Sequence, residues 1–89
     1  MAGYYAIITQ DEGNPSYGLH FHDLCALTVA DTIEELEVKG KEMLKVYLEE
    51  TEACGLPTPI SSDYRTVAAE AEKTTGMVGV MLVTVADKN

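Results

Sequence analysis

Residues 4–36 contain YYAII (4–8), YGLHF (17–21) and DTIEEL (31–36), and these three segments indicate the fold. The first is apolar on both faces and the second alternates apolar with polar residues, so both are expected to be strands. Residues 11–16 between them are rich in Asp, Gly, Asn and Pro and predict a hairpin loop. Thr32 followed by Glu35 is a capping-box pattern, which predicts the start of a helix.

This first helix has an apolar stripe at helical spacing and is expected to end near Gly55, because glycine commonly terminates helices. A second, Ala-rich helix is predicted, with Ser61 or Ser62 as its N-cap. The last segment is β-branched and apolar on both faces, which favours a buried strand. The order is therefore β-β-β-α-α-β, an α+β domain, with strands at about 3–9, 17–22, 26–30 and 77–86 and the second helix at about 62–74.

The chain has 89 residues and no internal repeat, so residues 1–89 are expected to form one small domain. Fifteen Asp and Glu against six Lys and Arg give a formal net charge of −9. A field of this sign repels nucleic-acid phosphates and attracts basic partners. The acidic residues could also simply keep a small protein soluble, and composition alone leaves both interpretations open.

Cys25 and Cys54 lack the spacing of a redox or metal motif, and the N-terminal residues lack the features of a secretory signal. The longest apolar run, residues 77–83, is too short to cross a membrane. We therefore expect a cytoplasmic protein with both thiols reduced and no membrane association.

His20, His22 and Cys25 lie close enough in the sequence to suggest a metal site. A complete site needs a further ligand, and no second His or Cys pair is present, so neither a metal nor a cofactor is expected. The acidic residues lie in turns or on the outer face of the first helix, and neither thiol has an identifiable base. The chain is therefore not expected to be an enzyme.

Residues 4–59 resemble the HicB-like antitoxin family. Three positions depart from the family pattern: His22 replaces a proline, Cys25-Ala26 replaces a Pro-Gly turn, and Ala30 replaces a glycine. The residues that fit the pattern are Tyr4, Ala6, Ile7, Asp11, Gly13, Tyr17, Gly18, Phe21, Asp23, Leu24, Asp31, Thr32, Glu34, Glu35, Leu56, Pro57 and Pro59.

The resemblance implies a truncated RNase H-like fold, with a four-stranded mixed sheet in the order 3-2-1-4 and both helices on one face. It also implies a protein that neutralises a small basic RNA-cleaving toxin by covering its RNA-binding surface. Many relatives carry a C-terminal DNA-binding domain, but this chain ends at Asn89, so no such domain and no DNA binding by itself are expected. The alternative is an orphan domain of the same fold that binds RNA or another regulatory partner without catalysis. A residual nuclease is disfavoured because the first strand has no Asp.

Two surfaces are expected to make contacts. The acidic turn (Asp11, Glu12) and the connection after the second strand (His22, Asp23) are the candidate partner-binding residues. With both helices on one face, the other sheet face and the edge of the last strand would be uncovered, which predicts a homodimer or higher oligomer. The candidate interface residues are Val78, Val80, Met81 and Val83.

Overall fold

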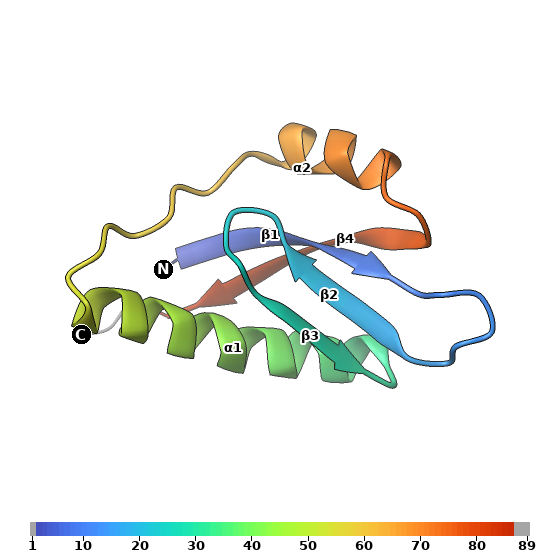
Figure 1. The fold of residues 1–89 in the computed structure, drawn as a ribbon, viewed down its shortest axis with the longest axis horizontal. Coiled ribbons are helices and arrows are strands. Elements are labelled where there is room, and N and C mark those ends of the chain that lie inside the picture. Colours follow the sequence, from blue (N-terminus) through green and yellow to red (C-terminus); the bar gives the residue numbers. More distant parts are fainter. Residues whose placement is uncertain (1, 87–89) are drawn as a thin grey trace.

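The computed structural model describes residues 2–86, which form one four-stranded sheet with two helices (Figure 1). The strand order is β3-β2-β1-β4, which confirms the predicted α+β class and strand order. Every predicted element is present, with ends within about two residues of those expected. The elements are β1 (Ala2–Thr9), β2 (Tyr17–Phe21), β3 (Leu27–Ala30), α1 (Ile33–Ala53), α2 (Tyr64–Glu72) and β4 (Met77–Val85).

All three strand pairs are antiparallel, so the expectation of a mixed sheet is wrong. α1 returns along the sheet after β3, and a strand that followed it directly would run parallel to β1. Instead residues 54–76, which include α2, cross the sheet a second time (Figure 1). β4 therefore begins beside the end of β1, where the Gln10 N–H donates to the Gly76 carbonyl at 2.9 Å.

The two helices lie on opposite faces of the sheet, and the expectation that both would share one face is also wrong (Figure 1). Successive strand residues point to opposite faces. Ala6 and Ile8 of β1 pack in the larger core with α1, whereas Ile7 between them packs with Val67 and Ala71 of α2. α2 thus covers part of the face that was expected to be open.

Each helix begins at a side-chain cap. The Thr32 hydroxyl accepts a hydrogen bond from the Glu35 N–H at 3.1 Å, as the capping pattern predicted. α2 is capped by Asp63, whose Oδ1 accepts from the Thr66 N–H at 2.9 Å, and not by either serine before it. Ser62 does not cap the helix, because its N–H and its hydroxyl both donate to Asp23, 39 positions earlier.

Candidate functional site

The four expected partner-binding residues lie at opposite ends of the β1–β2 hairpin. Asp11 and Glu12 are exposed in the loop that joins β1 to β2. His22 and Asp23 follow β2 at the other end, where the His22 N–H donates to the Tyr5 carbonyl at 3.3 Å. The fold therefore does not bring the two pairs together.

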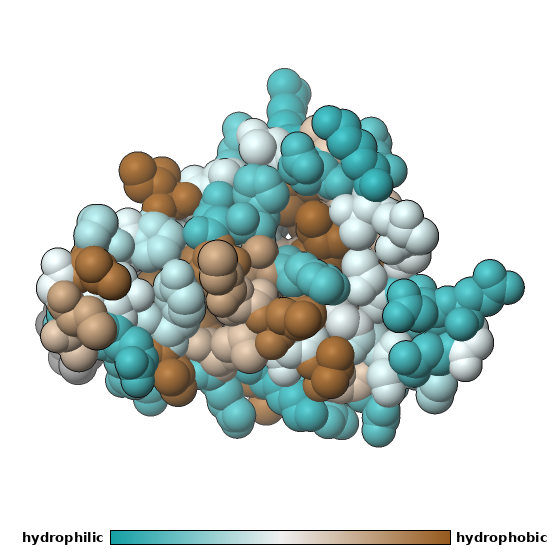
Figure 2. Space-filling model, in the orientation of Figure 1, coloured by the Kyte–Doolittle hydropathy of each residue, from teal (hydrophilic) through white to brown (hydrophobic). Residues whose placement is uncertain are grey.

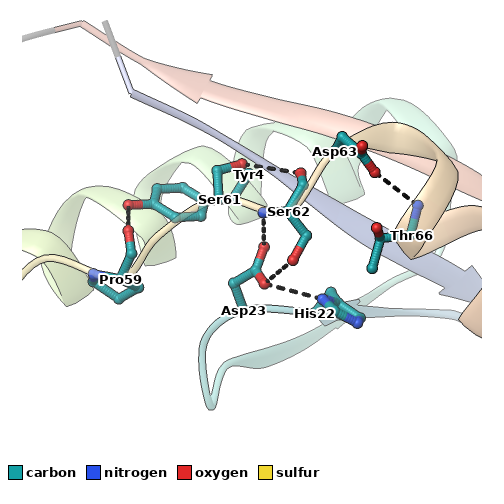
Figure 3. Close-up of polar contacts among 8 residues, drawn as sticks. All are labelled: Tyr4, His22, Asp23, Pro59, Ser61, Ser62, Asp63 and Thr66. Carbon is teal, nitrogen blue, oxygen red and sulfur yellow. Dashed lines mark hydrogen bonds and ion pairs between the residues drawn. The ribbon is translucent and has the colours of Figure 1, made fainter.

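Asp23 ties the β2–β3 connection to the segment that leads into α2 (Figure 3). Its Oδ2 accepts a hydrogen bond from the Ser62 N–H at 2.8 Å, and its Oδ1 accepts from the Ser62 hydroxyl at 2.6 Å. His22 Nδ1 lies 3.0 Å from Asp23 Oδ1. Nearby, the Tyr4 hydroxyl donates to the Pro59 carbonyl at 2.6 Å. These five residues are called the clasp below.

The contacts of the clasp shift the pKa values of two of its members, Asp23 and Tyr4. Partial burial acts to raise the pKa of Asp23, but the hydrogen bonds from Ser62 and His22 outweigh it and hold that pKa below its usual value. Burial, and next the negative charge of Asp23, raise the pKa of the Tyr4 phenol. Asp23 is therefore an anion in the folded protein, and Tyr4 is a neutral hydrogen-bond donor.

The clasp contains Ser, His and Asp, but their arrangement differs from that of a nucleophilic triad. In such a triad the histidine accepts the serine proton. Here the Ser62 hydroxyl donates to Asp23, and His22 bonds to the same carboxylate oxygen. The side chain of Asp23 is only 10% exposed. The geometry therefore assigns Asp23 a fastening role between two chain segments.

The suspected metal ligands have separate surroundings. His20 Nε2 lies 3.1 Å from the Thr9 hydroxyl, His22 bonds to Asp23, and Cys25 is exposed. Within residues 2–86 no three His, Cys, Asp or Glu side chains converge in an arrangement that could hold a metal ion.

An open groove of about 860 Å³ runs between β3 and α1, and sequence reasoning did not identify it. Most of its lining is apolar, and its charged lining residues are Glu42, Glu50 and Lys39 of α1. Val46, one of two exposed valines in α1, was the available signal. The apolar lining is provided by Ala26, Leu27, Met43, Val46 and Tyr47.

Lys39 fixes the β3 side of this groove. Its Nζ donates to the Val29 carbonyl at 3.1 Å and lies 3.2 Å from Glu35 Oε1. The lysine therefore occupies a carbonyl of β3 that points away from β2. It also balances the negative charge of Glu35, one helical turn earlier in α1. Beyond it, the exposed surface of α1 carries more glutamates than lysines, although Lys41 and Lys45 are exposed too, and its last turn has no basic residue. The exposed glutamates of α1 are Glu34, Glu35, Glu37, Glu42, Glu49, Glu50 and Glu52.

The four expected interface residues of β4 have different environments. Val83 is fully buried in the core under α1, and Met81 is packed against that core. Val80 packs against the smaller core under α2. Val78 is 50% exposed. Leu82, which the sequence analysis did not select, is 48% exposed. A contact through β4 would therefore use Val78 and Leu82 rather than Val83.

The remaining apolar side chains do not form one continuous patch on the face seen in Figure 2. They emerge as several brown groups separated by hydrophilic side chains. Scattered apolar residues are normal on soluble proteins. The groove with its glutamates, rather than any broad apolar patch, is therefore the candidate partner site.

No protein-family model, curated protein or solved structure matches this chain. Among the helices that the structure describes, none is long and apolar enough to span a membrane.

Proposed function

We propose that this domain is a non-catalytic, antitoxin-type module that binds and neutralises a small basic RNA-cleaving protein in the cytoplasm. The observation that carries the proposal is the groove beside α1, whose mainly apolar lining includes the carboxylates of Glu42 and Glu50. Lysines and arginines that hold RNA phosphates would pair with these glutamates, while aliphatic parts of the partner contact the apolar lining. RNA and this domain would then compete for the same basic surface.

The overall charge supports the same assignment. A net charge of −9 attracts a basic protein and repels RNA, so association with such a partner should be fast and weakened by salt. Glu49, Glu50 and Glu52 lie near the negative end of the α1 dipole, where carboxylates destabilise a helix. Acidic residues in this unfavourable position are consistent with a binding role.

Growth rescue tests the proposal directly. The gene beside this one should encode a short basic protein whose expression arrests growth, and co-expression of this domain should restore growth. The two proteins should also co-purify at low salt. Growth that stays arrested while both proteins are soluble would contradict the proposal.

A pair of double variants tests the groove. Glu42→Lys with Glu50→Lys should weaken binding of the basic protein at least about tenfold. Glu70→Lys with Glu72→Lys changes the net charge equally but lies on α2. This control should have a much smaller effect. Equal losses for the two pairs would mean that the overall field, and not the groove, attracts the partner.

A further inference from the structure

Among residues 2–86, β4 is an unpaired edge of the sheet, and it is the longer of the two edges. Its nine residues, Met77–Val85, include no charged side chain. The opposite edge, β3, has only four residues, and Lys39 occupies its Val29 carbonyl. A short edge strand and a side chain that covers its backbone both hinder strand addition. Of the two sheet edges in the described part of the chain, β4 is therefore the one that is open over a long, uncharged stretch.

The hydrogen-bond pattern shows which peptide groups of β4 point outward. The His22 N–H bonds to the Tyr5 carbonyl, so Tyr5 and Ile7 direct their peptide groups towards β2. In an antiparallel ladder the intervening residues, Ala6 and Ile8, bond to the other neighbour, β4. On β4, Ala6 is paired with Met81 and Ile8 with Gly79. By the same alternation Tyr4 is paired with Val83.

The alternate residues Val80, Leu82 and Thr84 consequently present their N–H and C=O groups to the outside. No hydrogen bond from any residue in the range 2–86 reaches these groups. Leu82 adds an apolar side chain that is 48% exposed. The β4 edge thus combines free backbone donors and acceptors with apolar surface, which is what an added strand recognises.

We propose that this edge pairs with β4 of a second copy of the chain, antiparallel, around a two-fold axis at Met81. Met81 is the midpoint of Met77–Val85, so this register pairs the whole strand. It places Val80 opposite Leu82 of the partner copy, both with outward peptide groups. The product is a continuous eight-stranded sheet that ends in two β3 edges. Because those edges are protected, assembly stops at a dimer.

Area favours a second copy as the occupant, and the lack of charged side chains on β4 limits the repulsion between the copies. Two chains of charge −9 repel each other, but pairing through β4 joins them by strand residues that carry no charge. The chain exposes 5822 Å², whereas a folded monomer of 9.7 kDa usually exposes about 5,100 Å². The excess is close to the roughly 800 Å² that each partner buries in a standard interface.

Light scattering of the intact chain during size-exclusion chromatography tests the dimer. At about 100 µM the mass should be twice 9.7 kDa. Leu82→Lys should reduce it to the monomer mass, because the lysine would lie opposite Val80 of the other copy. Leu56→Lys is the matched control, since Leu56 is 61% exposed on the segment after α1, and it should leave the dimer intact. A monomeric wild type, or an equal effect of the two variants, would overturn the proposal.

Amide hydrogen exchange separates dissociation from misfolding. In the wild type the amides of Val80 and Leu82 should exchange slowly. In Leu82→Lys the amide of Val80 should become fast, while those of Met81 and Val83 stay protected by β1. Fast exchange of Val80 and Leu82 in a wild-type dimer would show that a different surface associates.

Two further measurements test the register and the charge argument. With Cys25 and Cys54 replaced by serine, Met81→Cys should form a disulfide-linked dimer, because cross-strand pairs that are not hydrogen-bonded lie about 4.5 Å apart at Cα. Val38→Cys on the outer face of α1 should not. Salt should strengthen self-association by screening the like charges, whereas it should weaken binding of the basic partner. Absence of the Met81→Cys cross-link, or a dimer weakened by salt, would contradict this pairing.

Discussion

Asp23 and Ser62 are joined by two hydrogen bonds although 39 positions separate them in the sequence. One bond fixes the backbone of Ser62 and the other its side chain, so the carboxylate sets both the position and the orientation of the residue. The segment between α1 and α2 is thereby fastened beside the β2–β3 connection (Figure 3). This fastening leads the chain to the sheet face that α2 covers.

Asp23→Ala should destabilise the fold by about 1–3 kcal/mol, because two donors of Ser62 would lose a charged acceptor. Urea unfolding at neutral pH measures the free energy of unfolding. Asp11→Ala is the control, since Asp11 lies exposed in the β1–β2 loop. Equal stability of the two variants would show that the Asp23–Ser62 contact contributes nothing.

The Asp23 contribution should depend on pH. Its folded-state pKa is lowered, so the native state binds the proton less tightly than the unfolded chain, whose Asp pKa is about 3.9. The stabilisation is complete above that value and is lost as the pH falls through the folded-state pKa. The stability difference between wild type and Asp23→Asn should therefore be largest near neutrality and should shrink below about pH 4. A difference that grows on acidification would contradict this sign.

Tyr4→Phe should loosen the segment between α1 and α2 without unfolding the sheet. The variant leaves the Pro59 carbonyl without its donor, at a cost of about 1 kcal/mol. Limited proteolysis should then cut within residues 54–62 faster than in the wild type. Tyr64→Phe serves as the control because the Tyr64 ring packs edge-on against Tyr5 and lies outside the clasp. An unchanged cleavage rate in Tyr4→Phe would mean that the remaining contacts hold the segment between α1 and α2 in place without this hydrogen bond.

Gly76→Ala should destabilise the protein by about 1–3 kcal/mol. Gly76 has a φ of +77°, and a Cβ there would lie 2.9 Å from the Gln10 carbonyl oxygen, at the point where β4 starts beside β1. At Gly79 an added Cβ meets nothing within 4 Å, and φ is not positive. Gly79→Ala should therefore keep or slightly raise the melting temperature, and a comparable loss in both variants would be inconsistent with this explanation.

The elements themselves could be read from the sequence because their signals are local. The period of two in β2 and the Thr32–Glu35 cap each involve residues a few positions apart, and the structure has the strand and the helix start where they were expected. The candidate site could not be predicted from such local signals. The groove requires β3 and α1 to lie side by side, and the clasp requires contacts across 39 and 55 positions.

Sequence alone determined the class, the order of the elements and the uncharged character of β4, since all three follow from patterns along the chain. It could not determine the direction of β4 or the face that α2 covers. β1 and β4 are apolar on both sides, so either face could have accepted α2. The α2 cap was likewise expected at Ser61 or Ser62, whereas the structure has it at Asp63. Tertiary contacts decided the cap and the face of α2. Asp23 accepts both hydrogen bonds of Ser62, and Asp63 then caps α2 on the sheet face opposite α1.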